Sequence, residues 1–337
     1  MTRRAVTAAL GILLIAASSM LALPAAPATA QKPLSIRLGV HTALMGAPDV
    51  IAIRAGYFKQ EGLDVQWRRF SLGKEGRDAM IAGHIDVNNT APVPFLVGLD
   101  KGVPYVAIAV NSYFCGINQM VVAKNADINS IAQLKGKKIG LPKGTITEFV
   151  FQTRTAPAHG LKAGDYQIAN IPDSKDRIPS LVAKAVDAIV LNEPFTSIGE
   201  NEGLIRVIEN FCKYDILPFM TTATTKIVKE NPDAVVAYLR GWLRAVKLLK
   251  EEPEKAATLY LEDLKSLGRD IPLPVLVKAL GRMQWEPAID AKMDKYLLDI
   301  AKDMVAAPAG ASDRIKAVPD LGKGVNKELL QKAAAGR

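Results

Sequence analysis

The sequence has few of the residues that metal and redox chemistry require. Its 337 residues include only two cysteines, Cys115 and Cys212, and three histidines. Two cysteines form no zinc site unless histidine joins them, and His41, His84 and His159 are not spaced as ligands. We therefore expect no metal and no cofactor. In an oxidising compartment the two cysteines can form a disulfide, and two buried free thiols are the alternative.

Motifs for nucleotide and acyl-transfer chemistry are also missing. The sequence contains no G-x-S-x-G, no P-loop and no Rossmann glycine pattern, and the glycines at 73 and 76 lack phosphate-loop spacing. The basic clusters at 135–138 and 247–255 mix with acids or lie beside a turn, which is typical of a solvated surface. We expect neither an enzyme nor a nucleic-acid-binding protein.

Long apolar runs are confined to the N-terminus. Arg3 and Arg4 precede an apolar stretch over 5–23, and Ala28-Thr29-Ala30 gives an A-x-A pattern. This order predicts a signal peptide over 1–30 that is cleaved after Ala30, with an uncleaved membrane anchor as the alternative. The two arginines do not separate general secretion from twin-arginine export. We expect a soluble, periplasmic mature protein.

The rest of the chain predicts alternating strands and helices. Strands are expected over 35–40, 63–70, from 85, 105–110, 119–123, 138–141, 166–171 and 188–191. Helices are expected over 47–55, 77–82 and 178–185, with a glycine-bearing loop over 71–76. This alternation is typical of an α/β fold with mainly parallel sheets.

The last third is predicted to be mostly helical. Asn231-Pro232 is a strong helix start, and the apolar residues that follow lie on one helical face, which indicates core packing. The tail from 306 to 337 is rich in Ala, Gly and Lys, and we expect it to pack loosely.

Five phrases occur in an order that resembles the sulfonate, nitrate and taurine type of ABC-transporter solute-binding proteins. They are Gly56-Tyr57-Phe58 with its continuation to Val65, Ala82-Gly83-His84-Ile85-Asp86-Val87, Leu134-Lys135-Gly136, Val186-Asp187-Ala188 with Glu193-Pro194, and Asn231-Pro232 with the later Pro253-Glu254. Two departures are Lys184-Ala185, where the family often has a glycine, and His41, where it has a glutamine-like residue.

The resemblance implies a two-lobed periplasmic-binding-protein fold of the type II kind. Lobe 1 would be discontinuous, over 34–117 and 218–305, and lobe 2 would cover 118–217. The resemblance also places Cys115 and Cys212 near the two crossovers, which makes a hinge disulfide conceivable. The implied partners are a small-molecule solute and the permease subunits of an ABC importer, and we expect a monomer.

In open parallel sheets, ligands bind beyond the carboxyl ends of the strands, so the loops after the strands hold the candidate ligand-binding residues. These candidates are His41, Thr42, Ser71, Gly73, Asn89, Thr90, Tyr113, Lys143, Gly144, Thr145, Thr147, Glu193 and Phe195. The basic balance favours an anionic or zwitterionic organic solute. Thr145 has the alternative role of capping its own helix, and Glu193 that of pairing with a cation such as Lys143.

Two other functions stay open. One is a protein that binds a thiamine-related pyrimidine precursor, or an enzyme that resembles the yeast synthase of that precursor. That synthase type needs a cysteine-rich metal motif, which two distant cysteines do not supply. The other is a receptor that feeds a sensor kinase rather than a transporter.

Overall fold

The computed structural model describes residues 34–307 and 314–336, and these residues form one compact unit. The predicted signal peptide over 1–30 lies outside the described residues. Within the described residues, no helix has both the length and the apolar character that crossing a membrane would need.

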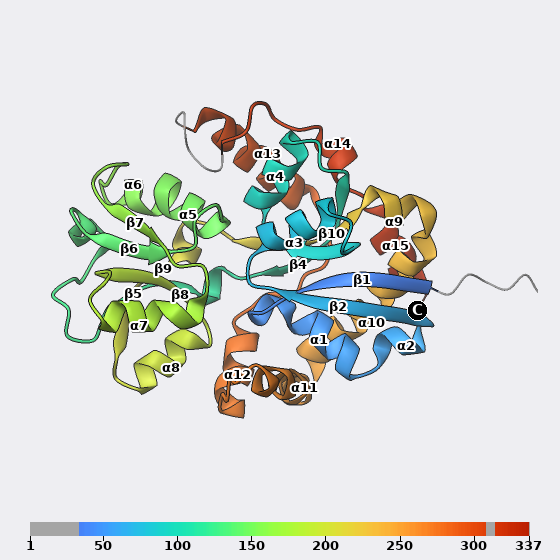
Figure 1. Cartoon of the computed structure of the whole chain (residues 1–337), viewed down its shortest axis with the longest axis horizontal. Helices are drawn as coiled ribbons and strands as arrows, with labels where there is room; N and C mark the ends of the chain where they lie inside the picture. Colours follow the sequence, from blue (N-terminus) through green and yellow to red (C-terminus); the bar gives the residue numbers. More distant parts are fainter. Residues whose placement is uncertain (1–33, 308–313, 337) are drawn as a thin grey trace, which may run out of the picture. The chain divides into compact units, whose positions relative to one another are not determined.

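The fold is built on two five-stranded sheets (Figure 1). Sheet A has the order β2-β1-β3-β10-β4, and sheet B the order β7-β6-β8-β5-β9. The strands of sheet A are β1 (Leu34–His41), β2 (Leu63–Phe70), β3 (Val87–Thr90), β4 (Tyr105–Tyr113) and β10 (Pro218–Thr224). The strands of sheet B are β5 (Asn118–Ala123), β6 (Lys138–Leu141), β7 (Gln167–Asn170), β8 (Ala188–Asn192) and β9 (Ile205–Asn210).

Each sheet is mainly parallel and contains one antiparallel strand. In sheet A this strand is β10, which runs against β3 and β4, and in sheet B it is β5, which runs against β8 and β9. In both cases it is the strand by which the chain enters from the other sheet, through the segments 114–117 and 211–217. The predicted α/β architecture with mainly parallel sheets is therefore confirmed.

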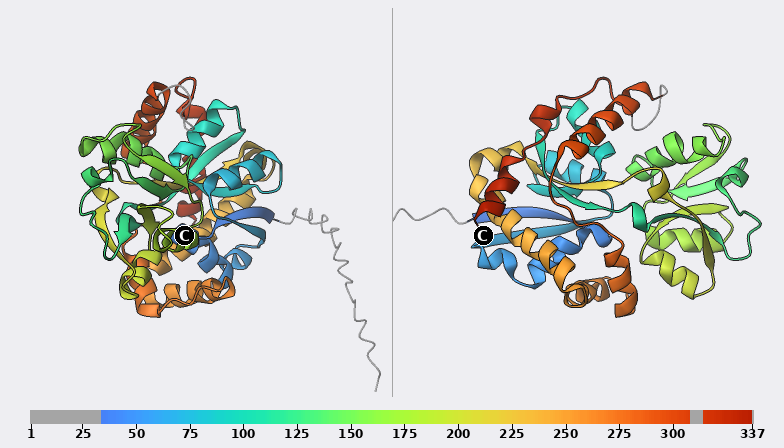
Figure 2. Two further views of the ribbon diagram at one scale, coloured as in Figure 1. Left: turned by 60° about the vertical axis from the view of Figure 1, so that its left-hand side comes forward. Right: turned by 180° about the vertical axis from the view of Figure 1, so that it is seen from behind.

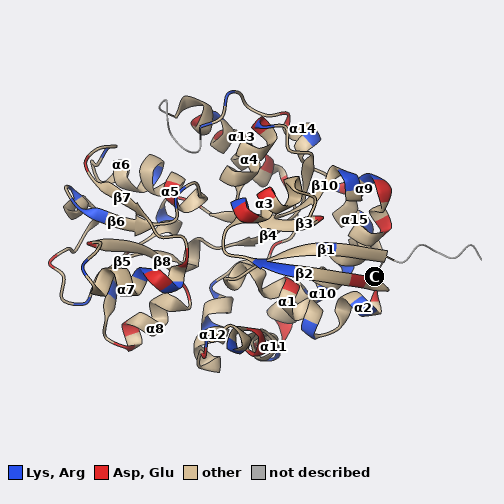
Figure 3. Ribbon diagram, viewed as in Figure 1, with Lys and Arg blue, Asp and Glu red and all other residues tan. Residues whose placement is uncertain are grey.

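Helices flank both sheets. The first eight are α1 (Ala47–Arg54), α2 (Tyr57–Gln60), α3 (Gly73–Ile81), α4 (Pro92–Asp100), α5 (Ile146–Val150), α6 (Ala156–Ala158), α7 (Arg177–Val182) and α8 (Phe195–Asn201). The later ones are α9 (Thr225–Glu230), α10 (Pro232–Glu251), α11 (Pro253–Ser266), α12 (Leu273–Gly281), α13 (Ala291–Ala306), α14 (Leu321–Gly324) and α15 (Glu328–Ala335). Lys and Arg are interspersed with Asp and Glu over these helices (Figure 3).

Helix α3 begins four residues earlier than the sequence predicts. The carboxylate of Glu75 accepts the backbone N–H groups of Ser71 and Leu72, at 3.0 and 3.1 Å. These bonds satisfy donors ahead of the first turn, as in a capping box, so the helix starts at Gly73 instead of near Arg77. The segment predicted as a glycine-bearing loop is thus largely helical.

The prediction of a loosely packed tail is wrong for the part of it that contains α14 and α15. Helix α15 packs against α10 beside sheet A (Figures 1 and 2), and Leu329 and Ala333 are buried there. Val325 pairs with Ala107 of β4, and the backbone N–H of Asn326 donates to the carbonyl of Ala107 at 2.8 Å. Apolar residues spaced four apart, Leu329 and Ala333, thus form a packing face in an alanine-rich segment.

Cys115 and Cys212 form a disulfide, with their Cα atoms 4.7 Å apart. Cys115 lies in the segment that leads from β4 to β5, and Cys212 in the segment that leads from β9 to β10. The bond therefore joins the two connections between the sheets.

Candidate functional site

A cavity lies where the carboxyl ends of strands from both sheets meet. Measured as the space open to the centre of a water molecule, it has a volume of about 80 Å³. Its lining includes residues at or after the ends of β1, β2, β3 and β4 and, from sheet B, of β6, β7 and β8. The polar lining residues are His41, Thr42, Ser71, Lys74, Thr145, Thr147, Asp173, Ser174, Arg177, Asn192 and Arg269, and the large apolar ones include Met45, Leu72, Phe114, Ile146, Phe195 and Phe219.

His41 forms part of the sheet A wall of the cavity. Its Nδ1 accepts the backbone N–H of Ala43 at 3.0 Å, and its ring packs edge-on against Phe219. Burial, helped by the nearby charge of Arg269, lowers the pKa of His41 to about 4, although a hydrogen bond with the backbone of Ser71 opposes this shift. The imidazole is therefore neutral at physiological pH and held by the backbone on both sides.

Gly73 brings the start of α3 close to the end of β3. A Cβ atom at this position would lie 2.4 Å from the Oγ1 of Thr90 and 3.0 Å from its Cα, so only glycine fits without a shift of the backbone. The close approach places Lys74 at the cavity, where its Nζ donates to the carbonyl of Lys143 at 3.0 Å. Lys74 thus connects the sheet A wall to the sheet B wall.

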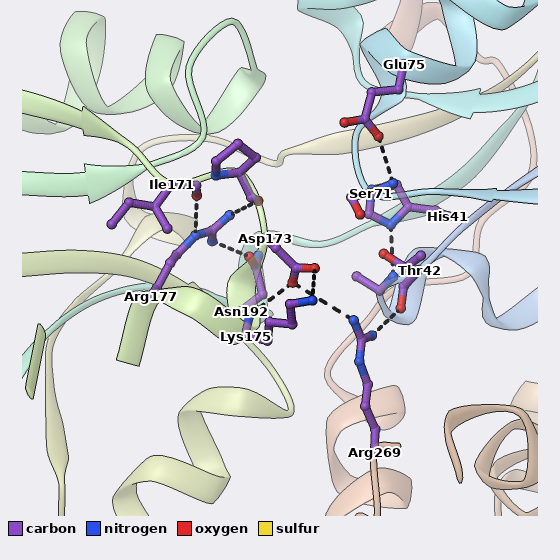
Figure 4. A network of polar contacts seen from close by, with 12 residues as sticks. His41, Thr42, Ser71, Glu75, Ile171, Asp173, Lys175, Arg177, Asn192 and Arg269 are labelled. Atoms are coloured by element: carbon purple, nitrogen blue, oxygen red, sulfur yellow. Dashed lines mark hydrogen bonds and ion pairs between the residues drawn. The ribbon is translucent and has the colours of Figure 1, made fainter. Parts of the chain in front are cut away.

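The opposite wall contains a buried arginine. Arg177 is 3% exposed and donates to the carbonyls of Pro172 and Val190. It also donates to the carbonyl of Ile171 (Figure 4). Its Nη1 also donates to the Oδ1 of Asn192 at 3.3 Å. Desolvation lowers the pKa of Arg177 to about 10, so the guanidinium remains charged at neutral pH.

Arg269 approaches the sheet B wall from the sheet A side. Its Nη1 donates to the carbonyl of Thr42 at 2.7 Å, and its Nη2 lies 4.0 Å from a carboxylate oxygen of Asp173 (Figure 4). The guanidinium also lies over the ring of Phe195, 5.4 Å from the centroid. The Arg269–Asp173 distance is beyond hydrogen-bonding range, so this cation retains bonding capacity towards the cavity.

Seven of the thirteen predicted site residues line the cavity: His41, Thr42, Ser71, Gly73, Thr145, Thr147 and Phe195. Thr145 also caps α5, because its Oγ1 accepts the backbone N–H of Glu148 at 3.4 Å. The two roles proposed for Thr145 are therefore compatible.

Asn89 and Thr90 are buried and are not among the residues that line the cavity. The amide of Asn89 donates to the carboxylate of Asp49 and accepts from Thr221 at 2.9 Å, so its bonding capacity is used inside the core. Thr90 is buried behind Gly73.

The other four predicted residues also lie away from the lining. Tyr113 exchanges backbone hydrogen bonds with Gln284, at 2.9 and 3.1 Å. Lys143 has an exposed side chain, and the backbone N–H of Gly144 donates to Glu148 at 2.5 Å. Buried Glu193 forms an ion pair, but with Arg282 and not with Lys143.

Sequence reasoning missed several polar lining residues. Asp173 and Ser174 lie in the loop after β7, which ends at Asn170, so the rule that selects loops after strands could have found them. Arg269 follows α11, some two hundred residues after β1, and no local signal in the sequence links it to the cavity.

Comparison with known families gives one match over most of the chain. The family model described as NMT1/THI5 like matches residues 45–256. These residues include the whole of sheet B and four strands of sheet A, which are β2, β3, β4 and the return strand β10; β1 precedes the matched range.

Individual proteins show the same likeness. A putative aliphatic sulfonates-binding protein of Bacillus subtilis is 29% identical over 247 residues, which is 72% of this chain and 73% of that protein. The taurine-binding periplasmic protein of Escherichia coli is 28% identical over 278 residues, 76% of this chain and 83% of that protein. Among solved structures, the alkanesulfonate-binding protein SsuA from Xanthomonas axonopodis pv. citri, bound to MOPS, matches with a TM-score of 0.76 and 17% identity, over 88% of this chain and all of that one. At 17% identity, the similarity to this solved structure shows the fold alone.

Proposed function

The chain belongs to the NMT1/THI5-like family, and we propose on this premise that it is an extracytoplasmic solute-binding protein of an ABC-type importer. It captures a small anionic or zwitterionic organic solute, of the sulfonate or taurine class, between two lobes. The lobes comprise residues 34–117 with 218–305, and residues 118–217. The cleaved N-terminal segment over 1–30 directs the protein to the periplasm, where it acts as a monomer.

The observation that carries this proposal is the cavity at the carboxyl ends of both sheets. Two guanidinium groups, Arg177 and Arg269, line it from opposite sides, and the apolar remainder includes Phe114, Phe195 and Phe219. Cations beside aromatic surface suit a solute that has an anionic head and an apolar body.

Contacts between the two walls support a closure mechanism. Lys74 reaches the carbonyl of Lys143, Arg269 approaches Asp173, and Arg282 pairs with Glu193. Each cation comes from the sheet A side and each acceptor from the sheet B side. A solute that bridges the walls adds to these contacts, so it shifts the population towards the closed form, which the permease then recognises.

The test is a thermal-shift measurement on the purified exported protein. The panel contains taurine, alkyl and aryl sulfonates, nitrate, aromatic carboxylates and pyrimidines. A solute at 100 times its Kd stabilises the native state by about 2.7 kcal/mol and raises Tm by a few degrees. A saturable shift with a sulfonate supports the proposal. A response to pyrimidines alone favours the precursor-binding function, and a flat panel contradicts the proposed solute class.

A further inference from the structure

A chain of hydrogen bonds runs through the sheet B wall from Arg177 to Thr147. Arg177 Nη1 donates to Asn192 Oδ1 at 3.3 Å, and Asn192 Nδ2 donates to Asn118 Oδ1 at 2.8 Å. Asn118 Nδ2 then donates to Thr147 Oγ1 at 3.4 Å. Asn118 and Asn192 are direct partners in the pairing of β5 with β8, so the backbone register holds the two amides together.

The direction of this chain follows from its first member. A guanidinium has only N–H donors, so the atom of Asn192 that faces Arg177 is its oxygen. The amide nitrogen of Asn192 therefore faces Asn118, which must accept with its own oxygen. That leaves the nitrogen of Asn118 to donate to Thr147. Because a positively charged donor begins the chain, the orientation of both amides is determined without any assignment of amide atoms.

The last member of the chain lines the cavity. Thr147 accepts from Asn118, so its hydroxyl proton is directed elsewhere, and the side chain is one of the lining residues. Asn118 is fully buried and Thr147 is 7% exposed, and in such surroundings successive hydrogen bonds strengthen one another. The same chain with the opposite direction would make Thr147 an acceptor towards the cavity.

We propose that Arg177, Asn192 and Asn118 are positioning residues, which hold Thr147 as a hydrogen-bond donor to the solute. Through this donor, the sheet B wall selects solutes that present an acceptor-rich anionic group to Thr147 over analogues that present an N–H donor to it. This inference rests on the proposed function, because it concerns the solute of the same cavity. It adds the atomic cause of selection, and it gives Arg177 and Asn192, which also line the cavity, a second role beside Asn118 in acting through Thr147.

The experiment compares two probes of nearly equal shape, butane-1-sulfonate and butane-1-sulfonamide, by calorimetry. The sulfonamide replaces one acceptor oxygen by an NH₂ donor. In Asn118→Asp, the carboxylate still accepts the hydrogen bond from Asn192, but it offers Thr147 only an acceptor. The Thr147 hydroxyl therefore turns inward to donate to this carboxylate, and its lone pairs face the cavity. Thr147→Val removes the hydroxyl with little change of shape.

Asn170→Asp is the matched control for the added charge. Asn170 ends β7, is exposed, and accepts the backbone N–H of Lys143 at 3.0 Å, a bond that a carboxylate preserves. It lies outside the cavity lining. Circular dichroism and the Tm of each variant establish that it is folded before affinities are compared.

We expect the wild-type protein to prefer the sulfonate. Thr147→Val should weaken sulfonate binding by roughly tenfold to a hundredfold, the usual loss for a hydrogen bond to a charged group. Asn118→Asp should lower the sulfonate-to-sulfonamide preference by about tenfold or more and improve sulfonamide affinity, whereas Asn170→Asp should leave sulfonamide affinity unchanged. Equal effects of the two aspartate variants on both probes, or unchanged sulfonate binding by Thr147→Val, would overturn the proposal.

A second measurement separates this inference from the proposed function. If the wild-type protein binds neither probe, the sulfonate class is wrong, and neutron diffraction of the unliganded protein then decides the direction of the chain. A deuterium on Thr147 that points into the cavity supports the positioning role. A deuterium that points at Asn118 contradicts it.

Discussion

Buried Asp49 combines two hydrogen bonds with a strongly shifted pKa. Its carboxylate accepts from Tyr238 at 2.7 Å and from Asn89, inside the core of the sheet A side. Desolvation nevertheless dominates and raises the pKa of Asp49 to about 7, from 3.8. Since folding favours the protonated form, the stability that Asp49 contributes is fully present below about pH 4 and is lost as the pH rises through 7.

We predict that Asp49→Asn removes a pH-dependent loss of stability. Between about pH 4 and 7, the wild-type protein should lose up to about 1.4 kcal/mol per pH unit relative to the variant. His41, whose pKa is lowered to about 4, contributes the opposite trend in the same window, but it is present in both proteins and cancels in the difference. Urea unfolding at several pH values measures this difference, and parallel profiles would contradict the assigned shift.

At the scale of single elements, α15 is predicted to stabilise the protein through α10. Leu329 is 4% exposed, whereas its neighbour Gln331 is exposed. Leu329→Ala should therefore lower the free energy of unfolding by about 2–5 kcal/mol, the usual cost of truncating a buried leucine. Gln331→Ala is the control and should change it by less than about 0.5 kcal/mol. Similar effects of both substitutions, measured by urea unfolding, would mean that α15 is not part of the cooperative unit.

The elements that the sequence predicts well are those with strong local signals. The range 63–70 alternates apolar and polar residues, and β2 occupies that same range. Asn231 and Pro232 start α10 as predicted, with the Asn231 side chain accepting the N–H of Ala234 at 3.4 Å. The sequence pattern does not predict where α3 begins, because the side chain of Glu75 accepts hydrogen bonds from backbone donors before the helix, and no periodicity reveals these bonds.

The sequence predicts residues of the candidate site only where they follow the end of a predicted strand. The rule that selects loops after strands chooses His41 and Thr147, which line the cavity, and also Asn89, whose amide is hydrogen-bonded to Asp49 in the core. The polar chain behind Thr147 depends on the pairing of Asn118 with Asn192, which are 74 residues apart. Arg269 likewise reaches the cavity through tertiary packing, which a strand-by-strand interpretation does not supply.

At the scale of the whole molecule, the Cys115–Cys212 disulfide connects the two segments through which the chain passes between the sheets. It closes a loop with a sequence separation of 97, and this loop contains all strands of sheet B. In the chain-entropy model, a cross-link over about 100 residues stabilises a protein by about 4–5 kcal/mol, and the loss of a native disulfide usually costs about 2–5 kcal/mol. Reduction should therefore act mainly on the sheet B part.

We predict that reduction separates two unfolding transitions that coincide in the oxidised protein. The three tryptophans, Trp67, Trp242 and Trp285, all lie outside the closed loop, so their fluorescence reports the sheet A part, whereas far-ultraviolet circular dichroism reports both parts. With the disulfide reduced, the dichroism signal should fall at lower urea concentration than the fluorescence signal. A Cys115→Ser, Cys212→Ser double variant should behave like the reduced protein and be insensitive to reductant. Coincident transitions with an unchanged midpoint after reduction would show that the disulfide does not stabilise the sheet B part.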